Sequence, residues 1–475
     1  MSAGSGAEGR RPGRWPDYRA VWRWHFYAGL FCIPFVIWLA ITGSIYLWQP
    51  QVNAWLDQPY AHLLQPGRAR LSPSAEVGAA LRSQPGAALH AYQLPVTPDG
   101  AAQVLVGRGQ GQVRVWVHPV TGAVAKSTPE DQRFMKVVFR LHGELLAGDK
   151  GSILVELAAS WAIVMILTGV YLWWPRGAQG LAGTLYPRLH LRGRALWRDL
   201  HASTGLWVSA FALFLLLSGL PWAKSWGGNL QVVRAVAGRA MVRQDWTTGR
   251  SSELAERAAL SRGSLAGQQA AKSDGEHGEH AGMHGTAAAM APDPPDGYRA
   301  LDRTVPTVAA LALPAPVLVT PALREQGPWT ARSDTPNTPR RVNLTLDPGT
   351  GAVLKRETFG QRNWLDQAIG VGIAAHEGQL FLGNQIISLL TAAGLLLIAV
   401  SGAMMWWRRR PDGVLGAPVP AGEPRFAVGL AAIVVVLGVL LPLLGASLVA
   451  VFLAERFVLR RMPGVNTWLG LRGAT

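Results

Sequence analysis

The sequence predicts a mainly α-helical membrane protein, in which four core spans form a helical bundle and a fifth span follows at the C-terminal end. Of its 475 residues, 49% are hydrophobic and only 16% are charged, whereas charged residues make up about 25% of ordinary soluble domains. The apolar residues gather in five runs, each near the roughly 20 residues that a helix needs to cross the hydrocarbon core. These runs are 26–48, 153–174, 205–223, 385–407 and 427–453.

The first and last runs need separate arguments. Residues 26–48 are too long and too apolar for the core of a cleavable signal peptide, and no A-x-A motif follows, so we interpret them as an uncleaved span. In the last run, Pro442 predicts either a kink or a re-entrant hairpin. We expect a full crossing there. The second run contains the only charge within the five runs, Glu156.

Arginines near the span ends predict the orientation, because Lys and Arg concentrate on the cytoplasmic side. They precede the first span, separate the second from the third and follow the fourth, as Arg10, Arg11, Arg14, Arg19, Arg23, Arg176, Arg188, Arg192, Arg194, Arg198, Arg408, Arg409 and Arg410. The predicted divisions are a cytoplasmic N-terminus 1–24, span 25–48, outer segment 49–141, span 142–174 with a preceding histidine segment, cytoplasmic loop 175–200, span 201–223, outer segment 224–375, span 376–407 with a preceding histidine segment, cytoplasmic loop 408–426, span 427–453 and tail 454–475.

The formal net charge of +16 and the single cysteine limit the function classes. The basic residues lie beside apolar runs and no zinc-finger or RNA-binding signature occurs, so membrane lipid is a better partner than nucleic acid. Cys32 alone cannot form an internal disulfide, a cysteine-based iron–sulfur site or a C-x-x-C-H haem attachment. Any haem must therefore be held without covalent bonds, as haem b.

The two outer segments carry similar strand, turn and strand patterns. Val113–Val117 alternates valines and leads into "VHPVTGAV", and Arg341–Leu346 leads into "DPGTGAV". These patterns predict two small α+β modules that arose by duplication. Residues 262–298, which are rich in Gly, Ala, Ser and His, are predicted to be a disordered insertion.

The spans repeat the same pattern. Four of them end in a Thr-Gly or Ser-Gly step followed by aromatic residues, in the strings "ITGSIYLW", "LTGVYLWWP", "LSGLPW" and "VSGAMMWW". A histidine precedes the glycine of each step by 18, 27, 18 and 26 residues in chain order. The alternation predicts an internal duplication, in which His25 matches His201 and His142 matches His376.

The topology places the four histidines in two pairs. His25 and His201 each begin an outward span, whereas His142 and His376 each precede an inward one. Two axial ligands of one haem must lie within roughly 4–5 Å of each other, since a metal–imidazole bond is about 2 Å long. His25 lies about 27 Å below the outer end of its helix, so it can pair with His201 but not with His142. The pattern thus predicts two haem b groups, one per leaflet.

Other interpretations remain open at this point. A histidine near a span end is often an interfacial residue that binds water or headgroups, and these four could hold a metal without haem. Two bis-imidazole haems, in contrast, would favour electron transfer over oxygen binding because no coordination position stays open. In the insertion, His277, His280 and His284 form a weak candidate site for copper or zinc, for which a tolerated low-complexity segment is the competing explanation.

The motifs "LHGELLAGDKG", "LTGVYLWWPR" and "VSGAMMWWRRRP", together with two "TGAV" modules, resemble the PepSY-associated transmembrane family of bacterial inner-membrane proteins, over about residues 15–460. The resemblance implies a helical bundle with periplasmic PepSY modules. Some members are similar to haem-containing reductases of ferric siderophores. By that resemblance His25, His142, His201 and His376 are haem ligands, and the activity is an oxidoreductase that reduces a periplasmic ferric siderophore, or another metal chelate, for iron uptake.

Two other functions compete with the reductase. In one, the modules bind peptides or restrain a protease and the histidines are structural. In the other, the chain is a permease for a chelate or for haem, against which the nearly apolar centres of the spans argue. No flavin or nicotinamide site is visible, so a reductase would need a separate electron donor, either quinol or a soluble reductase.

Overall fold

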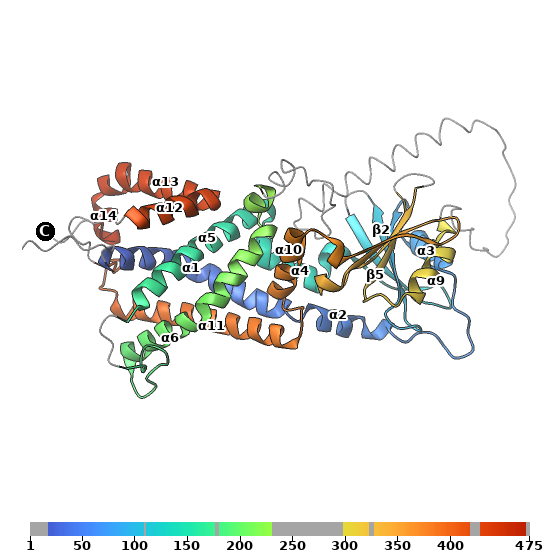
Figure 1. Ribbon diagram of the computed structural model, residues 1–475, viewed down its shortest axis with the longest axis horizontal. Helices are drawn as coiled ribbons and strands as arrows, with labels where there is room; N and C mark the ends of the chain where they lie inside the picture. The colour runs from blue at the N-terminus through green and yellow to red at the C-terminus, as the bar shows by residue number, and fades with distance from the viewer. Residues whose placement is uncertain are drawn as a thin grey trace, which may run out of the picture. The chain divides into compact units, whose positions relative to one another are not determined.

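The computed structural model describes residues 18–108, 111–175, 180–229, 298–322, 327–418 and 428–471 (Figure 1). The chain divides into two compact units. We call them the helical unit, made of Met1–Ile41, Ser152–Val242 and Leu390–Thr475, and the sheet unit, made of Thr42–Gly151 and Arg243–Leu389. The helices α1, α5 and α11 contribute residues to both units, and each unit is considered by itself.

Five helices in the described part of the chain are long and apolar enough to cross a membrane, as the sequence predicts. A helix suits this environment because it satisfies its backbone polar groups internally, which hydrocarbon cannot do. The five candidate spans are α1 (Tyr18–Tyr46), α5 (Gly148–Trp173), α6 (Gly193–Gly219) with the following 3-10 turn η3 (Leu220–Trp222), α11 (Leu382–Arg409), and α13 (Pro442–Phe457) with η7 (Leu459–Arg461).

The fifth span differs from the prediction of one helix over 427–453. The run forms two helices, α12 (Val428–Leu440) and α13, which lie side by side (Figure 1). Pro442 starts the second helix because it has no N–H to donate to the preceding turn. The helices approach so closely at the break that a Cβ on Gly445 would lie 2.6 Å from the carbonyl oxygen of Gly438. The segment that is long enough to span is therefore Pro442–Arg461.

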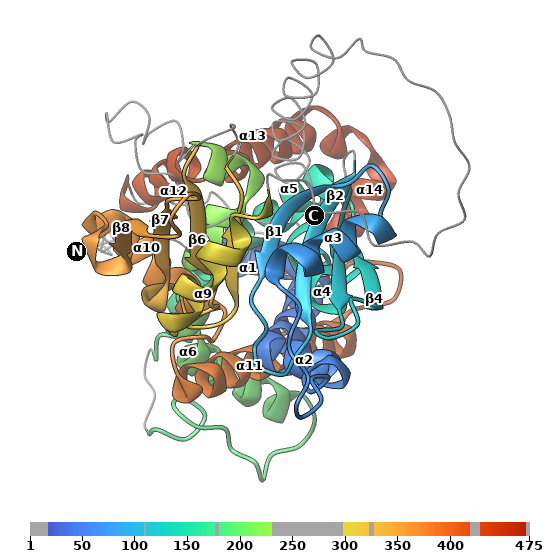
Figure 2. The same cartoon turned by 90° about the vertical axis from the view of Figure 1, so that its right-hand side faces the viewer.

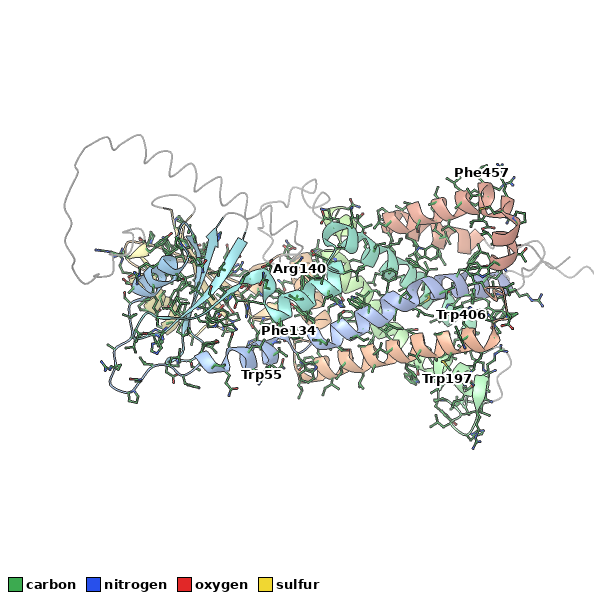
Figure 3. The ribbon with its side chains drawn as sticks, turned by 180° about the vertical axis from the view of Figure 1, so that it is seen from behind. Trp55, Phe134, Arg140, Trp197, Trp406 and Phe457 are labelled. Carbon is green, nitrogen blue, oxygen red and sulfur yellow. The ribbon has the colours of Figure 1, made fainter. Side chains whose placement is uncertain are left out.

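The hairpin of α12 and α13 packs against α5 and has an apolar outer surface. Leu441 and Leu444 at the break are buried with Ile163 of α5, and the Trp161 indole donates to the Ser447 hydroxyl at 3.1 Å. Phe457 is 54% exposed (Figure 3), as suits contact with lipid tails.

Glu156, the charge in the second span, is used structurally. It is buried, and its carboxylate accepts the backbone N–H of Ser225 at 2.8 Å and of Trp226 at 3.1 Å. These bonds tie the segment after α6 to α5 and satisfy N–H groups that would otherwise lack partners.

The sheet unit contains one antiparallel sheet of eight strands, in the order β4-β3-β2-β1-β5-β6-β7-β8. The two predicted modules therefore share a sheet, because β1 pairs with β5 through Tyr92↔Val319 and Gln93↔Leu318. The strands are β1 (Ala88–Gln93), β2 (Ala102–Arg108), β3 (Gly111–Val117), β4 (Val124–Pro129), β5 (Val317–Thr320), β6 (Trp329–Ser333), β7 (Val342–Leu346) and β8 (Val353–Thr358).

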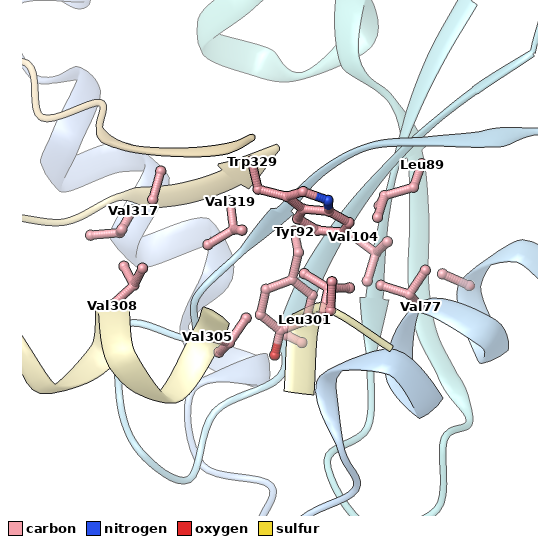
Figure 4. Close-up of a cluster of buried hydrophobic side chains, with 14 of the residues drawn as sticks. Val77, Leu89, Tyr92, Val104, Leu301, Val305, Val308, Val317, Val319 and Trp329 are labelled. Carbon is pink, nitrogen blue, oxygen red and sulfur yellow. The ribbon is translucent and has the colours of Figure 1, made fainter. Parts of the chain in front are cut away.

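Each half of the sheet is a helix followed by four consecutive strands. The helices α3 (Pro73–Ser83) and α9 (Leu301–Ala310) cover the same face (Figure 2). Between them and the sheet lies the core, where Val77 of α3 and Leu301 of α9 pack with Tyr92, Val104 and Val319 (Figure 4). Alternating apolar residues in the strands supply this buried face.

The two outer hairpins match in detail. In the turn between β3 and β4, Gly122 has φ +70° and its N–H donates to the His118 carbonyl oxygen. Between β7 and β8, Gly351 has φ +76° and donates to Asp347 in the same way. A positive φ favours glycine, which explains the "TGAV" strings. The strands predicted around both turns are confirmed.

Short helices connect the sheet to the spans. After β4 come the 3-10 turn η2 (Glu130–Gln132) and α4 (Phe134–Glu144), and after β8 come η6 (Phe359–Gln361) and α10 (Trp364–His376). The remaining elements are α2 (Gln49–Asp57), η1 (Gln58–Tyr60), η5 (Thr338–Arg340) and α14 (Pro463–Leu469).

Candidate functional site

The first histidine pair, His25 of α1 and His201 of α6, lies within the helical unit. The two imidazole centroids are 6.3 Å apart and the ring planes are 85° from parallel. The residues come from helices 176 positions apart in the chain, so tertiary packing brings them together. The sequence predicts this pairing, and the structure juxtaposes the two rings.

The His25 ring is held by the Thr-Gly step of α5. Its Nδ1 lies 3.0 Å from the Thr168 hydroxyl, which itself donates to the Val164 carbonyl oxygen at 2.8 Å. Because that hydroxyl proton is already used, the hydroxyl accepts from Nδ1–H and fixes the tautomer. A Cβ on Gly169 would lie 3.2 Å from Cε1 of His25, so the glycine makes room for the ring.

The His201 ring is held by the Ser-Gly step of α11 in the same way. Its Nδ1 lies 3.0 Å from the Ile398 carbonyl oxygen and 3.1 Å from the Ser401 hydroxyl. A carbonyl oxygen can only accept, so Nδ1 carries the hydrogen and Nε2 has the lone pair. A Cβ on Gly402 would lie 3.4 Å from Cε1. No described residue hydrogen-bonds Nε2 of His25 or His201.

The second histidine pair, His142 of α4 and His376 of α10, lies within the sheet unit. Its imidazole centroids are 6.4 Å apart, with an interplanar angle of 72°. Nδ1 of His142 lies 3.0 Å from the Thr42 hydroxyl, and a Cβ on Gly43 would lie 3.1 Å from Cε1. The Thr-Gly step at the end of α1 therefore seats His142 as the step of α5 seats His25.

A buried ion pair fixes the start of α4 to the sheet. Arg114 of β3 donates through Nε and Nη2 to the Glu130 carboxylate of η2, at 2.8 and 3.1 Å. Burial alone would raise the pKa of Glu130, but the guanidinium outweighs it and the pKa is lowered. On the other side, a capping box between Thr358 and Gln361 closes η6 before α10. The helices that carry His142 and His376 thus both leave the sheet through a fixed turn.

The spacing within each pair fits two axial ligands of one haem iron. Two metal–imidazole bonds of about 2 Å, plus the distance from each nitrogen to its ring centroid, separate the centroids by about 6 Å. An ordinary edge-to-face contact between two rings gives a similar spacing, so the spacing alone does not identify a metal site. The hydrogen bonds of the ring nitrogens distinguish the two cases. Where hydrogen bonds engage Nδ1, as they do on His25 and His201, the remaining nitrogen is the one a metal takes.

The donor set also fits a macrocycle better than a bare ion. Two imidazoles supply only two ligands, whereas protein sites for bare transition metals usually hold three or four. Within the described ranges, no group of three or more His, Cys, Asp or Glu side chains could hold an ion. The weak candidates His277, His280 and His284 lie outside the described residues.

The sequence predicts the four histidines but not the contacts that hold their rings, since a Thr-Gly or Ser-Gly step shows nothing of the helix that it faces. The structure shows that three of these steps, at Thr42, Thr168 and Ser401, seat a histidine ring from another helix. The invariant hydroxyl before each glycine was the available signal.

The fold and these pairs fit a multi-pass membrane protein with paired histidines on its helices, in which the chain segments after the first and third spans form one eight-stranded sheet. The chain matches the family described as PepSY-associated TM region over residues 22–409, and it belongs to that family. No curated protein matches it.

Proposed function

We propose that the chain is a transmembrane electron-transfer protein that holds two haem b groups and reduces a ferric siderophore in the periplasm. His25 and His201 hold one haem, and His142 and His376 hold the other. The observation that carries the proposal is the pair of 6.3 and 6.4 Å centroid spacings. Haem supplies reversible one-electron chemistry at a six-coordinate iron.

The contacts of the ligands support electron transfer rather than oxygen chemistry. The Thr168 hydroxyl and the Ile398 carbonyl oxygen hold two of the imidazoles by Nδ1, which fixes the ring orientation and raises the basicity of Nε2. A ligand held in this way does not swing off the metal, so the sixth position stays closed. These two contacts thus favour a site that gains or loses an electron with little movement of its imidazoles.

The arginine distribution supports the direction of transfer. Since Lys and Arg favour the cytoplasmic side, this distribution supports a first pair near the cytoplasmic face and a second pair near the periplasmic face. Quinol or a soluble reductase is the donor, and each electron converts one chelated Fe(III) to Fe(II), which siderophores release far more readily. The matched hairpins and the matched helix-and-strand order support an internal duplication with two PepSY modules.

The test is absorbance spectroscopy of the protein purified in detergent after expression with ample haem. The wild type should show a b-type Soret band and, after dithionite, a sharp α band. His201→Ala and His142→Ala should each lose about half of the α band, because each removes one of two sites. His62→Ala is the matched control, since its side chain is 70% exposed and pairs with Asp99.

The result that contradicts the proposal is equally clear. A membrane-inserted wild type without a Soret band would exclude haem and leave the sheet unit, as a peptide-binding module or protease restraint, as the better account. Equal spectra in wild type and both variants would show that haem binds elsewhere. For the activity, steady reduction of a ferric siderophore by dithionite-reduced protein is expected, with both histidine variants slower.

A further inference from the structure

Two arginines lie beyond the first histidine pair on the same helix faces. Arg194 precedes His201 by seven residues on α6, and Arg409 follows Gly402, which seats the His201 ring, by seven residues on α11. Seven residues are close to two helical turns, so each arginine lies on the face of the helix that carries the site, about 10 Å further along. Both displacements run toward the predicted cytoplasmic end.

The two guanidinium groups repel each other and have no acidic partner. Arg194 lies within electrostatic range of Arg409. No carboxylate of the described residues forms an ion pair with either. An anion that contacts both arginines would offset the repulsion between them.

Aromatic rings next to His25 hold Arg409 in position. Its guanidinium carbon lies 5.0 Å from the centroid of Trp22 and 5.4 Å from that of Phe26. Phe26 follows His25 directly, and Trp22 lies one helical turn before it. Stacking fixes the plane of the guanidinium, and Nη2 donates to the Gly416 carbonyl oxygen at 2.8 Å, which leaves Nε and Nη1 for further hydrogen bonds. Arg409 is thus linked to both ligands of the first pair.

We propose that Arg194 and Arg409 bind the two propionate carboxylates of the haem held by His25 and His201. This inference rests on the proposed function, because it requires haem at the first pair. The propionates leave one edge of the macrocycle together, and two arginines on one side of the ligands match that pattern. Guanidinium and carboxylate form charge-assisted, bidentate hydrogen bonds, and the nearby N-terminus of α6 adds a favourable dipole.

Other arginines at this end are already engaged. Arg188 and Arg198 share the buried carboxylate of Asp199, and Arg23 donates to the Gly470 carbonyl oxygen at 3.1 Å. Arg410 stacks on Trp406, which is labelled in Figure 3, and on Trp407. Arg194 and Arg409 differ from these arginines in that each lies seven residues from His201 or from the glycine that seats it.

The experiment measures haem release in the full-length protein, in a His142→Ala background that keeps only the first site. Transfer of haem to excess apomyoglobin is followed at the Soret band. Arg194→Gln with Arg409→Gln should accelerate release by roughly tenfold per arginine removed, as expected for lost charge-assisted bonds. Arg410→Gln is the matched control and should release haem at the background rate.

A second probe needs no substitution. Protein freed of haem is reconstituted with protohaem or with its dimethyl ester, which has the same iron and ring but no carboxylates. The ester should bind the arginine-containing protein more weakly than protohaem, and the double variant should bind both alike. Equal binding of ester and protohaem by the arginine-containing protein would overturn the proposal, as would unchanged release from the double variant. Absence of haem from the wild type would instead refute the proposed function.

Discussion

The two histidine pairs share one local device but differ in what supports it. For both histidines of the first pair and for His142 of the second, Nδ1 meets the hydroxyl of a Thr-Gly or Ser-Gly step and the imidazole lies on the glycine. The first pair stands on two long spanning helices, α1 and α6, and its seats are on two more, α5 and α11. The second pair stands on helices of 11 and 13 residues that leave a sheet. Helix packing therefore fixes the first pair, whereas the sheet sets the origin of both ligand helices in the second.

The surroundings of the pairs differ as well. Seven residues before the ligand, the first pair has Arg194, whereas the second has Met135 before His142 and Ile369 before His376. Near the second pair, the cations Arg341 and Lys136 act instead on Glu377, the residue that follows His376. Because the charges around the two pairs differ, the two sites should differ in affinity and in reduction potential.

Filling the glycine seats should break the pairs one at a time and have the largest effect. Gly43→Val should remove the haem of the second pair, because even a Cβ lies 3.1 Å from the His142 ring, and should leave the first intact. Gly402→Val should do the reverse. Reduced α-band absorbance measures each loss, at about half of the total. Gly205→Val is the control, since a Cβ there meets no atom within 4 Å. Equal loss of absorbance in all three variants would contradict the claim that Gly43 and Gly402 make room for the histidine rings.

Removing the hydroxyl should weaken the sites without emptying them. Thr168→Val removes the only acceptor that His25 Nδ1 has among the side-chain bonds described, so haem affinity should fall by roughly 10- to 100-fold. Ser401→Ala should cost less, because His201 keeps the Ile398 carbonyl oxygen. Titration of haem into the purified proteins ranks the two. A larger effect for Ser401→Ala would mean that the hydroxyl, not the carbonyl, orients His201.

A change of pH should affect the second pair, which the sheet supports, but not the first. This effect should be the smallest of those predicted here. Burial raises the pKa of Glu76 to about 7, and nearby Arg70 and the Tyr92 hydroxyl only partly offset this. The folded state then binds the proton more tightly than the unfolded state, so this stabilisation is complete below about 4.5 and is lost as pH rises through about 7.

We expect the thermal unfolding midpoint of the sheet unit to fall modestly between pH 5 and pH 8, with a parallel loss of the second haem. In Glu76→Gln that part of the pH dependence should vanish, because an amide does not titrate in this range. The first haem should not respond in either protein. A wild type and a Glu76→Gln variant with the same pH profile would show that Glu76 does not control the stability of the sheet unit.

Much of this architecture follows from local sequence. Span length and composition predict α1, α5, α6 and α11, since each needs only a sustained apolar run. The glycine turns at Gly122 and Gly351 predict the outer hairpins, because the positive φ is a property of a few adjacent residues. The repeat order of the histidines predicts which rings meet, and the structure brings both pairs together.

The features that escaped prediction depend on contacts between distant segments. The pairing of Tyr92 with Val319 joins two modules that look separate along the chain. A kink or a re-entrant hairpin was predicted at Pro442, and the structure divides the run there into α12 and α13, with Gly438 close to Gly445. The Arg114–Glu130 pair, likewise, joins residues that no periodic pattern connects. His277, His280 and His284 lie outside the described residues, and their predicted metal site stays a prediction.

The seam between β1 and β5 has a mechanical consequence. Its register contains only two residue pairs, Tyr92↔Val319 and Gln93↔Leu318, whereas the strands on either side pair over longer stretches. His142 is attached through β4 to one margin of the sheet and His376 through β8 to the other. The two imidazoles of the second pair are therefore joined through a sheet whose narrowest pairing lies at its centre. Bending of the sheet at this seam would change the distance between the two rings.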